Sequence, residues 1–238
     1  MPARPIFYDT ETTGIKSDKD RVIELAAYDP TTGESLVILI NPQMPIPAEA
    51  TAVHKITDEM VAEAPLFKEI IPRFLDFCAG DVILIAHNND AFDIHFLREE
   101  FRRSGHGLPS NWRFFDTLKW ARRYRPDLPR HSLQFLREVY GFEANNAHRA
   151  LDDVMILHQV FSAMTNDLDI DTAFQLLNVP RTIKTMPFGK YKGEALERIP
   201  SDYFVWLEGS GAFEKPENSD LKKAVEAHGK LKKEKALK

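Results

Sequence analysis

The sequence predicts a mixed α/β domain that is followed by a small second unit. Three short apolar runs come first, at residues 5–9, 21–28 and 35–40, and each has the length of a buried strand. Longer segments with helical spacing come next, and they enclose one further apolar strand at 82–86. Three successive strands followed by alternating helices and strands favour one mixed sheet with helices on its faces.

The helices are predicted from apolar residues that recur every three or four positions. The clearest helix runs from 147 to 165, with apolar residues at Ala150, Val154, Leu157 and Phe161. Asn146 before it is a residue type that caps helix N-termini. Further helices are predicted near 48–54, 66–78, 91–104, 116–124 and 131–139, and a short strand is predicted at 112–115.

Composition agrees with an ordinary globular protein that works inside the cell. Of 238 residues, 43% are hydrophobic and 28% are charged, which is close to the average for globular domains. The single cysteine, Cys78, lies in an apolar segment and leaves no disulfide framework to form. The apolar runs are too short to span a membrane, so we expect a cytoplasmic protein with no membrane partner.

Two acidic residues follow the first predicted strand. Asp9 and Glu11 stand two positions apart after the apolar run 6–8, and Gly14 ends the segment with a turn. Residues two apart in a strand face the same side of the sheet, so both carboxylates can bind one metal ion. A solvated turn is the structural alternative, but it does not explain two acids on one face of a buried strand.

A second acidic motif is His87-Asn88-Asn89-Asp90-Ala91-Phe92-Asp93, which offers Asp90 and Asp93 as rival carboxylates. We favour Asp93 because Phe92 precedes it and apolar residues that anchor a predicted helix follow it. The third motif places His148 and Asp153 five residues apart, which is about 140° around an α-helix. His148 is therefore predicted at or before the first turn, where it can swing towards a water molecule. A lone histidine would otherwise be a surface or capping residue.

Carboxylates that are crowded together in a protein repel each other unless cations lie between them. Mg²⁺ and Mn²⁺ prefer sites made of oxygen ligands. The three motifs therefore predict a metal-dependent site.

The three motifs together resemble the DEDDh family of 3′→5′ exonucleases. The resemblance rests on Asp9 and Glu11, on Phe92-Asp93 after His87-Asn88, and on the spacing of His148, Ala150 and Asp153. It implies a ribonuclease H-like fold for an exonuclease domain at 1–168. The segment from His87 to Asp93 is one residue longer than is usual in the family, which keeps Asp90 as a rival ligand.

The resemblance also implies roles for individual residues. Two Mg²⁺ or Mn²⁺ ions would be held by four carboxylates, and His148 would be the general base. Asp116 occupies a supporting position in the family. The metal ligands implied are Asp9, Glu11, Asp93 and Asp153, and the substrate-binding residues implied are Thr12, His54, Asn88 and Phe92.

The function implied is a 3′→5′ exonuclease that hydrolyses DNA and releases 5′-mononucleotides, of the exonuclease X-like type. Its partner would be DNA that is single-stranded or has a free 3′ end, in DNA repair or proofreading-type degradation. One alternative is a 3′→5′ exoribonuclease that trims RNA, because no feature reads the 2′-hydroxyl. An alternative of another class is a non-catalytic nucleic-acid-binding module, which would gain from losing these like charges.

The net charge of −5 alone argues against nucleic acid, but the charge is unevenly distributed. Residues 98–137 hold ten Lys and Arg against four Asp and Glu, and residues 221–238 hold seven Lys against two Glu. Such stretches are often solvated surface. Beside a nuclease site, the segment 119–125 is predicted to contact phosphates.

The second unit is predicted at residues 181–238, and it resembles the small C-terminal module of exonuclease X-like proteins. Two glycines enclose Lys190-Tyr191-Lys192, which can present two cations and a ring to nucleic acid. A hairpin turn with an aromatic anchor explains the same residues equally well. The unit is expected to bind nucleic acid or a protein partner, or to pack against the first domain.

Overall fold

The computed structural model describes residues 2–143, 150–166, 168–179, 182–215 and 218–231. The chain divides into two compact units, Met1–Leu177 and Asn178–Lys238. Each unit is described by itself. No helix within the described ranges is long and apolar enough to cross a membrane.

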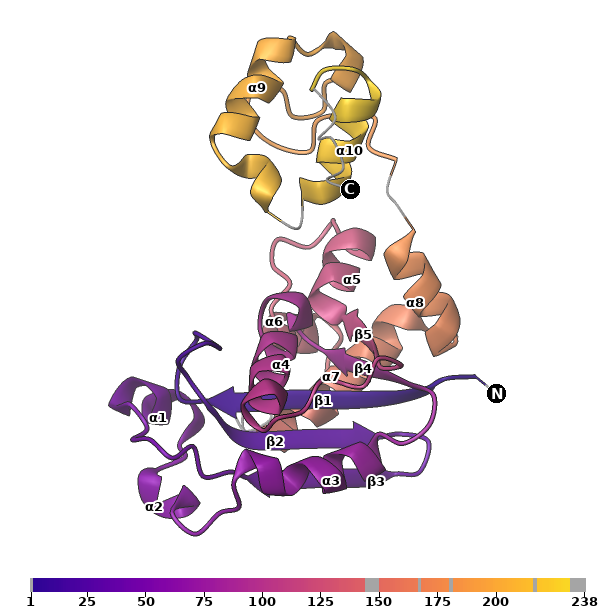
Figure 1. Cartoon of the computed structure of the whole chain (residues 1–238). Coiled ribbons are helices and arrows are strands. Elements are labelled where there is room, and N and C mark those ends of the chain that lie inside the picture. Colours follow the sequence, from indigo (N-terminus) through magenta and orange to yellow (C-terminus); the bar gives the residue numbers. More distant parts are fainter. Residues whose placement is uncertain (1, 144–149, 167, 180–181, 216–217, 232–238) are drawn as a thin grey trace. The chain divides into compact units, whose positions relative to one another are not determined.

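The first unit is built on one five-stranded sheet (Figure 1). Its strands are β1 (Arg4–Thr12), β2 (Val22–Asp29), β3 (Glu34–Leu39), β4 (Val82–Ala86) and β5 (Arg113–Asp116). Their spatial order is β3-β2-β1-β4-β5. β2 pairs antiparallel with β1 and β3, whereas β4 pairs parallel with β1 and β5. The mixed sheet predicted from the sequence is therefore confirmed, and β1 lies at its centre.

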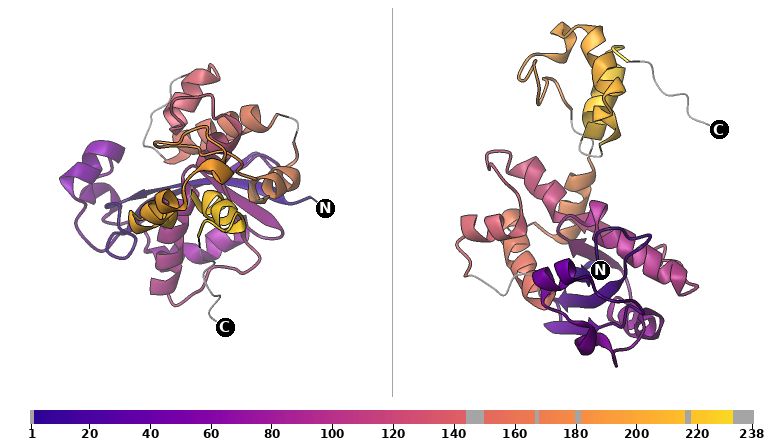
Figure 2. Two further views of the ribbon diagram at one scale, coloured as in Figure 1. Left: turned by 90° about the horizontal axis from the view of Figure 1, so that it is seen from above. Right: turned by 90° about the vertical axis from the view of Figure 1, so that its left-hand side faces the viewer.

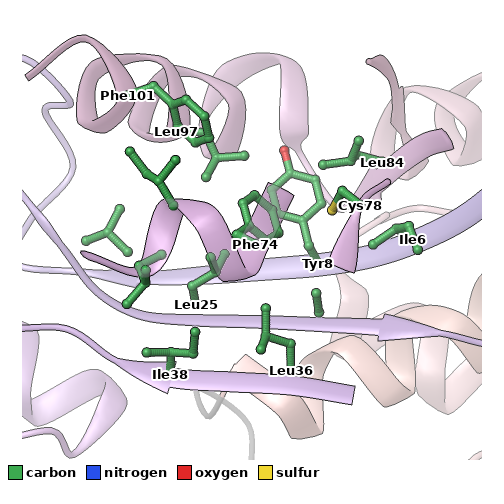
Figure 3. Packing of buried hydrophobic residues seen from close by; sticks show 14 of the residues in the cluster. Ile6, Tyr8, Leu25, Leu36, Ile38, Phe74, Cys78, Leu84, Leu97 and Phe101 are labelled. Carbon is green, nitrogen blue, oxygen red and sulfur yellow. The ribbon is translucent and has the colours of Figure 1, made fainter. Parts of the chain in front are cut away.

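One face of the sheet packs against α3 (Phe67–Phe77) and α4 (Asp93–Arg103). Every second side chain of β1 points into this layer, as the pleat of a strand requires. Figure 3 shows Tyr8 from β1 among Phe74 from α3 and Leu97 from α4, with Leu25 from β2 beside them. All four are buried, so this core fixes α4, and with it Asp93, against the sheet.

The other face is covered by α5 (Thr117–Tyr124), α7 (Ala150–Thr165) and α8 (Ile170–Asn178). Phe7 of β1 points into this second core, where its ring meets Phe161 of α7 edge to face at 5.4 Å. Figure 2 shows the sheet between its two helical layers from two further directions. The apolar stripe predicted for 147–165 is the buried face of α7.

Three short helices complete the first unit. They are α1 (Ala48–His54), α2 (Asp58–Val61) and α6 (Leu133–Val139). The sequence analysis predicted α1 and α6 but not α2, because a helix of one turn is too short to show a period. Ile56 and Val61 pack with Ile23 of β2 in a separate small core.

The compact first unit extends to Leu177, whereas the sequence analysis placed the end of the domain at residue 168. The difference is α8, whose Ala173 is buried in the second core. Asp171 also accepts a hydrogen bond from the Ala3 amide at 2.8 Å and pairs with Arg113 at 2.8 Å. These contacts tie α8 to the residue before β1 and to β5.

The second unit contains α9 (Ser201–Gly209), which was not predicted from the sequence, and α10 (Ser219–Ala227). Two 3-10 turns, η2 (Leu196–Arg198) and η3 (Ala212–Glu214), adjoin α9. The unit has a core of its own. The buried core residues are Met186, Leu196, Ile199, Phe204, Leu207, Phe213, Leu221, Val225 and Leu231.

A buried ionic network joins α4 to the start of β2. Glu100 of α4 is fully buried and accepts from Arg21 Nε at 2.7 Å and from Arg21 Nη2 at 2.9 Å. It also accepts from the Val22 amide at 3.2 Å and pairs with Arg103 at 3.3 Å. One carboxylate therefore holds the strand end and the helix together.

Replacing Glu100 with Ala is expected to lower the free energy of unfolding by about 3–5 kcal/mol, because two guanidinium groups lose their buried partner. Glu99→Ala is the matched control, since the neighbouring pair with Arg102 is exposed and is worth about 1 kcal/mol or less. Urea titration of both variants measures the difference. Equal losses would show that burial of the network does not matter.

Candidate active site

β1 carries two acidic residues on the face that α7 covers. Phe7 lies in the core under α7, and Asp9 and Glu11 continue the same side of the strand. The register places Asp9 opposite Ala26 and Glu11 opposite Glu24 of β2. The two carboxylates therefore lie on one face at the end of the central strand.

α7 brings a third carboxylate to the same place. One oxygen each of Asp9, Glu11 and Asp153 lies within 4.8 Å of the other two. All three side chains are partly exposed, so the cluster can be reached from solvent. Gln134 of α6 donates from Nε2 to Asp153 Oδ1 at 3.1 Å, which orients that carboxylate. Three anionic oxygens at this spacing suit a hard divalent cation.

Glu24 fixes where α7 begins relative to the sheet. It is buried in β2, and its Oε2 accepts from the Ala150 amide at 3.0 Å. This bond pairs an acidic group with the N-terminus of a helix, where negative charge is favoured. The sequence analysis did not select Glu24. The signal was present, because Glu24 is the one acidic residue in the apolar run 22–27.

Asp93 is the first residue of α4 and lies beside Thr10 of β1. Its side chain is 2% exposed, and Oδ1 accepts from the Thr10 hydroxyl at 2.8 Å and from the Thr10 amide at 3.2 Å. The Asp93 charge acts on Asp9, whose pKa it raises. The rival Asp90 is exposed and faces Lys119 at 3.5 Å.

Asp116 holds the loop that leads into α4. Its carboxylate accepts from the amides of Asn88 at 3.2 Å and Asp90 at 2.9 Å, and it also caps α5 through the amides of Leu118 and Lys119. Asn88 adopts a left-handed conformation with φ of 68°. A 3-10 turn, η1 (Asn89–Ala91), then leads to Asp93. One side chain thus supports the backbone of the whole second motif.

The environment of Asp9 and Asp93 disfavours their charged forms. Burial raises the pKa of Asp9 well above its usual range, and the charges of Asp93, Glu11 and Asp153 raise it further. Burial raises the pKa of Asp93 to about 7, although the hydrogen bonds from Thr10 act in the opposite direction. Cations between these carboxylates would remove the repulsion. The residues present therefore fit Mg²⁺ or Mn²⁺.

A family model described as "Exonuclease" matches residues 6–161. This range contains the three converging carboxylates, the second motif and most of the sheet. The chain belongs to the exonuclease family. It has a ribonuclease H-like fold, and members of this family act on nucleic acids with divalent metal ions.

Among its relatives, Exonuclease DPD1, chloroplastic/mitochondrial, from Arabidopsis thaliana is 36% identical over 181 residues. That alignment covers 69% of this chain and 57% of DPD1. DNA polymerase III PolC-type from Clostridium perfringens is 34% identical over 172 residues, which cover 69% of this chain and 12% of the polymerase. The chain thus spans little more than half of one relative and a small part of the other.

Solved exonuclease structures share the fold. Escherichia coli exonuclease I in complex with a dA16 oligonucleotide superposes with a TM-score of 0.62 and 22% identity, covering 73% of this chain and 42% of that one. Exonuclease X in complex with 5′ overhanging duplex DNA gives a TM-score of 0.55 and 24% identity, covering 73% of this chain and 99% of that one.

The C-terminal part of this chain is similar to a different family. A model described as "Putative quorum-sensing-regulated virulence factor" matches residues 175–228. The match spans most of the second compact unit.

The four predicted substrate-binding residues differ in how exposed they are to solvent. His54 is 2% exposed, and its Nδ1 accepts from the Ile56 amide at 3.0 Å. Thr12 is buried too and donates to the Gly14 carbonyl at 2.6 Å. Asn88 and Phe92 are partly exposed beside Asp93, where the Phe92 ring lies 4.9 Å from Phe96. The two buried residues offer a substrate little surface, and substrate contact stays a prediction for all four.

The predicted general base, His148, and the predicted cap, Asn146, lie outside the described residues. α7 is described from Ala150 onward, and Asp153 on it reaches the cluster. The role of His148 therefore stays a prediction that rests on the family motif.

The basic segment 119–125 forms α5 and the residue after it. Arg123 donates to the Leu177 carbonyl at 2.9 Å, and Arg125 pairs with Asp127 at 2.9 Å and with the Tyr140 hydroxyl at 2.7 Å. Lys119 also pairs with Asp90 at 3.5 Å, so three of these cations have structural partners within the first unit. Arg122 is exposed on the same helix, so the predicted phosphate contact rests on fewer side chains than the sequence suggested.

The stability of the metal-free protein is expected to fall as pH rises from about 4 to about 7. Because the folded-state pKa of Asp93 is raised above its usual value of 3.8, the folded state binds more protons than the unfolded state across this window. Asp93→Asn cannot titrate and keeps an oxygen that accepts from Thr10. At pH 8 the Tm of Asp93→Asn should exceed that of the wild type. The difference in Tm between the two proteins should be larger at pH 8 than at pH 5, by on the order of 5 °C.

Thermal melts of both proteins in EDTA at pH 5 and pH 8 measure this effect. Parallel pH dependences would contradict it. Adding Mg²⁺ at pH 8 should raise the Tm of the wild type more than that of Asp93→Asn.

Proposed function

We propose that this protein is a 3′→5′ exonuclease that hydrolyses DNA and releases 5′-mononucleotides. The observation that carries the proposal is the convergence of Asp9, Glu11 and Asp153 within 4.8 Å at the end of β1. A protein that only bound nucleic acid would have no use for three anionic groups facing phosphates. Membership of the exonuclease family supports the same conclusion.

In the proposed mechanism, Asp9, Glu11 and Asp153 would hold one divalent cation, and Asp9 with Asp93 would hold or position a second. Bound divalent cations supply the charge that stabilises the attacking and leaving oxygens of the phosphodiester. His148 takes a proton from the attacking water, and Gln134 keeps Asp153 oriented. Thr10 keeps Asp93 in place through two hydrogen bonds.

DNA as the substrate is supported by the relatives. The superposed structures of exonuclease I and exonuclease X hold an oligonucleotide and an overhanging DNA duplex, respectively. Phe92, partly exposed beside Asp93, is the proposed contact for the terminal bases. A role in DNA repair or proofreading-type degradation and a cytoplasmic location are parts of the same proposal.

Product analysis tests the polarity and the substrate. Matched single-stranded and duplex DNA and RNA oligonucleotides, labelled at the 3′ or the 5′ end, are incubated with and without Mg²⁺. The 3′ label should be released at once as a 5′-mononucleotide. The 5′-labelled strand should instead become shorter by one nucleotide at a time. Faster cleavage of RNA than of DNA would show that RNA, and not DNA, is the preferred substrate. First release of the 5′ label would overturn the polarity.

Single replacement of each proposed ligand should reduce cleavage by at least about 100-fold, because charge stabilisation in the transition state is lost. Asp90→Ala is the matched control, since its carboxylate belongs to the same motif as Asp93 but is exposed. It should keep most of its activity. The variants to measure are Asp9→Ala, Glu11→Ala, Asp93→Ala and Asp153→Ala. Activity that survives in Asp93→Ala and is lost in Asp90→Ala would show that Asp90, and not Asp93, is the metal ligand.

His148→Ala should lower kcat by about 10²- to 10⁴-fold with little change in substrate affinity, because a general base acts on the transition state. Wild-type activity should rise with pH as the imidazole loses its proton, since only the neutral form accepts one. His106→Ala replaces an exposed histidine and should behave like the wild type. An identical pH–rate profile in His148→Ala and the wild type would remove His148 from the mechanism.

A further inference from the structure

Three aromatic rings form a continuous row in the second unit. Tyr203 of α9 lies at its centre, with the Tyr191 ring edge-on at 4.8 Å on one side. On the other side, the Trp206 ring stacks on Tyr203 at 5.6 Å with an angle of 26° between the planes. The row therefore joins the outer side of α9 to the loop that carries Tyr191.

A tight hairpin places two lysines beside this row. The Met186 amide donates to the Glu194 carbonyl at 2.8 Å, and the Gly193 amide donates to the Met186 carbonyl at 2.7 Å. Gly189 at the tip has φ of 73°, and a Cβ there would clash with the Tyr203 hydroxyl. The hairpin therefore lies directly against Tyr203, which explains why a glycine stands at 189.

The two lysines flank Tyr191 at the tip of the hairpin. Lys190 Nζ lies 5.3 Å from the centre of the Tyr191 ring, and both Lys190 and Lys192 are exposed. The rings and the ammonium groups thus form one surface. We call it the aromatic–lysine surface, and it consists of Lys190, Tyr191, Lys192, Tyr203 and Trp206.

Trp206 leaves most of its ring in water. It is 62% exposed, whereas Trp112 and Trp120 in the first unit are 7% and 2% exposed. The buried side of α9 is supplied by Phe204 and Leu207, so Trp206 is not needed for the core of this unit. A tryptophan in this position keeps a large π-face available to a ligand.

The chemistry of the surface fits unpaired nucleic acid. Aromatic faces stack on any nucleobase, and ammonium groups bind the phosphates between bases. Asp202 and Glu208 of α9 are exposed and would repel phosphates, so the phosphates would lie on the hairpin side. Val205 is exposed next to Trp206, but one valine supplies little of the aliphatic area that a protein partner would need.

We propose that the aromatic–lysine surface binds single-stranded DNA by stacking a base on Trp206, with Lys190 and Lys192 contacting the neighbouring phosphates. The inference rests on the proposed function, because it gives the nuclease a second hold on its substrate. No step of hydrolysis takes place on this surface. It contributes affinity for the strand.

The difference in exposure between Trp206 and the two buried tryptophans provides a direct test in the full-length protein. Oligothymidylate is titrated in EDTA, so that no cleavage occurs, while tryptophan fluorescence is recorded. Quenching is expected because a base covers Trp206, and it should be absent in Trp206→Phe. An abasic oligomer of equal length and charge should cause little quenching. Quenching of equal size with the abasic oligomer, or none with oligothymidylate, would overturn the proposal.

Affinity provides the second readout. Trp206→Ala should weaken binding by roughly 5- to 100-fold, as loss of one stacked base does. Val205→Ala is the matched control, because it removes an exposed apolar neighbour and should change affinity less than twofold. The double variant Lys190→Ala, Lys192→Ala should reduce the salt dependence of binding by about one to two units of slope. Unchanged affinity in Trp206→Ala would exclude the stacking contact.

Asp9→Ala separates this inference from the proposed function. It should abolish cleavage in Mg²⁺ and leave the quenching of Trp206 in EDTA unchanged. Normal cleavage by Asp9→Ala would refute the proposed active site, while failure of the quenching would refute only the aromatic–lysine surface.

Discussion

The repulsion between carboxylates at the end of β1 is the constraint on which the rest of the first unit depends. Three anionic oxygens lie within 4.8 Å of one another, and Asp93 is hydrogen-bonded to Thr10 of the same strand. Their repulsion opposes folding unless other contacts hold their backbones in place. Those contacts are found around the cluster. Glu24 fixes the start of α7, Thr10 fixes Asp93, and Asp116 fixes the loop before α4. The scaffold therefore keeps the acids together before any cation binds.

The sequence predicted the elements that have a clear period. The strands β1 to β4 are short apolar runs, and α7 repeats its apolar residues at helical spacing, so both show their buried faces directly. In the second unit, residues 203–207 are Tyr-Phe-Val-Trp-Leu. Five apolar residues in succession show no period, so α9 was not predicted. Only the folded unit distinguishes its buried Phe204 from its exposed Trp206.

The part of the candidate site that could be predicted from the sequence is the set of carboxylates that belong to the acidic motifs. Asp9, Glu11 and Asp153 were selected from spacing and family resemblance, and the fold places them together. Residues that position another side chain or a helix through a hydrogen bond do not belong to a recognisable sequence motif. Gln134 and Glu24 were missed because their partners, Asp153 and the Ala150 amide, lie far away in the sequence. The sequence alone also does not show that Arg125, at the end of the basic segment, is paired with Asp127.

The central position of β1 has a consequence for how the sequence of this protein can vary. The strand is paired antiparallel with β2 on one edge and parallel with β4 on the other, so its register is fixed twice. Adding or deleting one residue before Asp9 would turn its carboxylate into the apolar layer around Phe74 and bring Tyr8 to the catalytic face. β1 can therefore accept exchanges of side chains but no change of length. Insertions and deletions should be confined to turns such as 30–33, where the chain can take up an extra residue without rotating a strand.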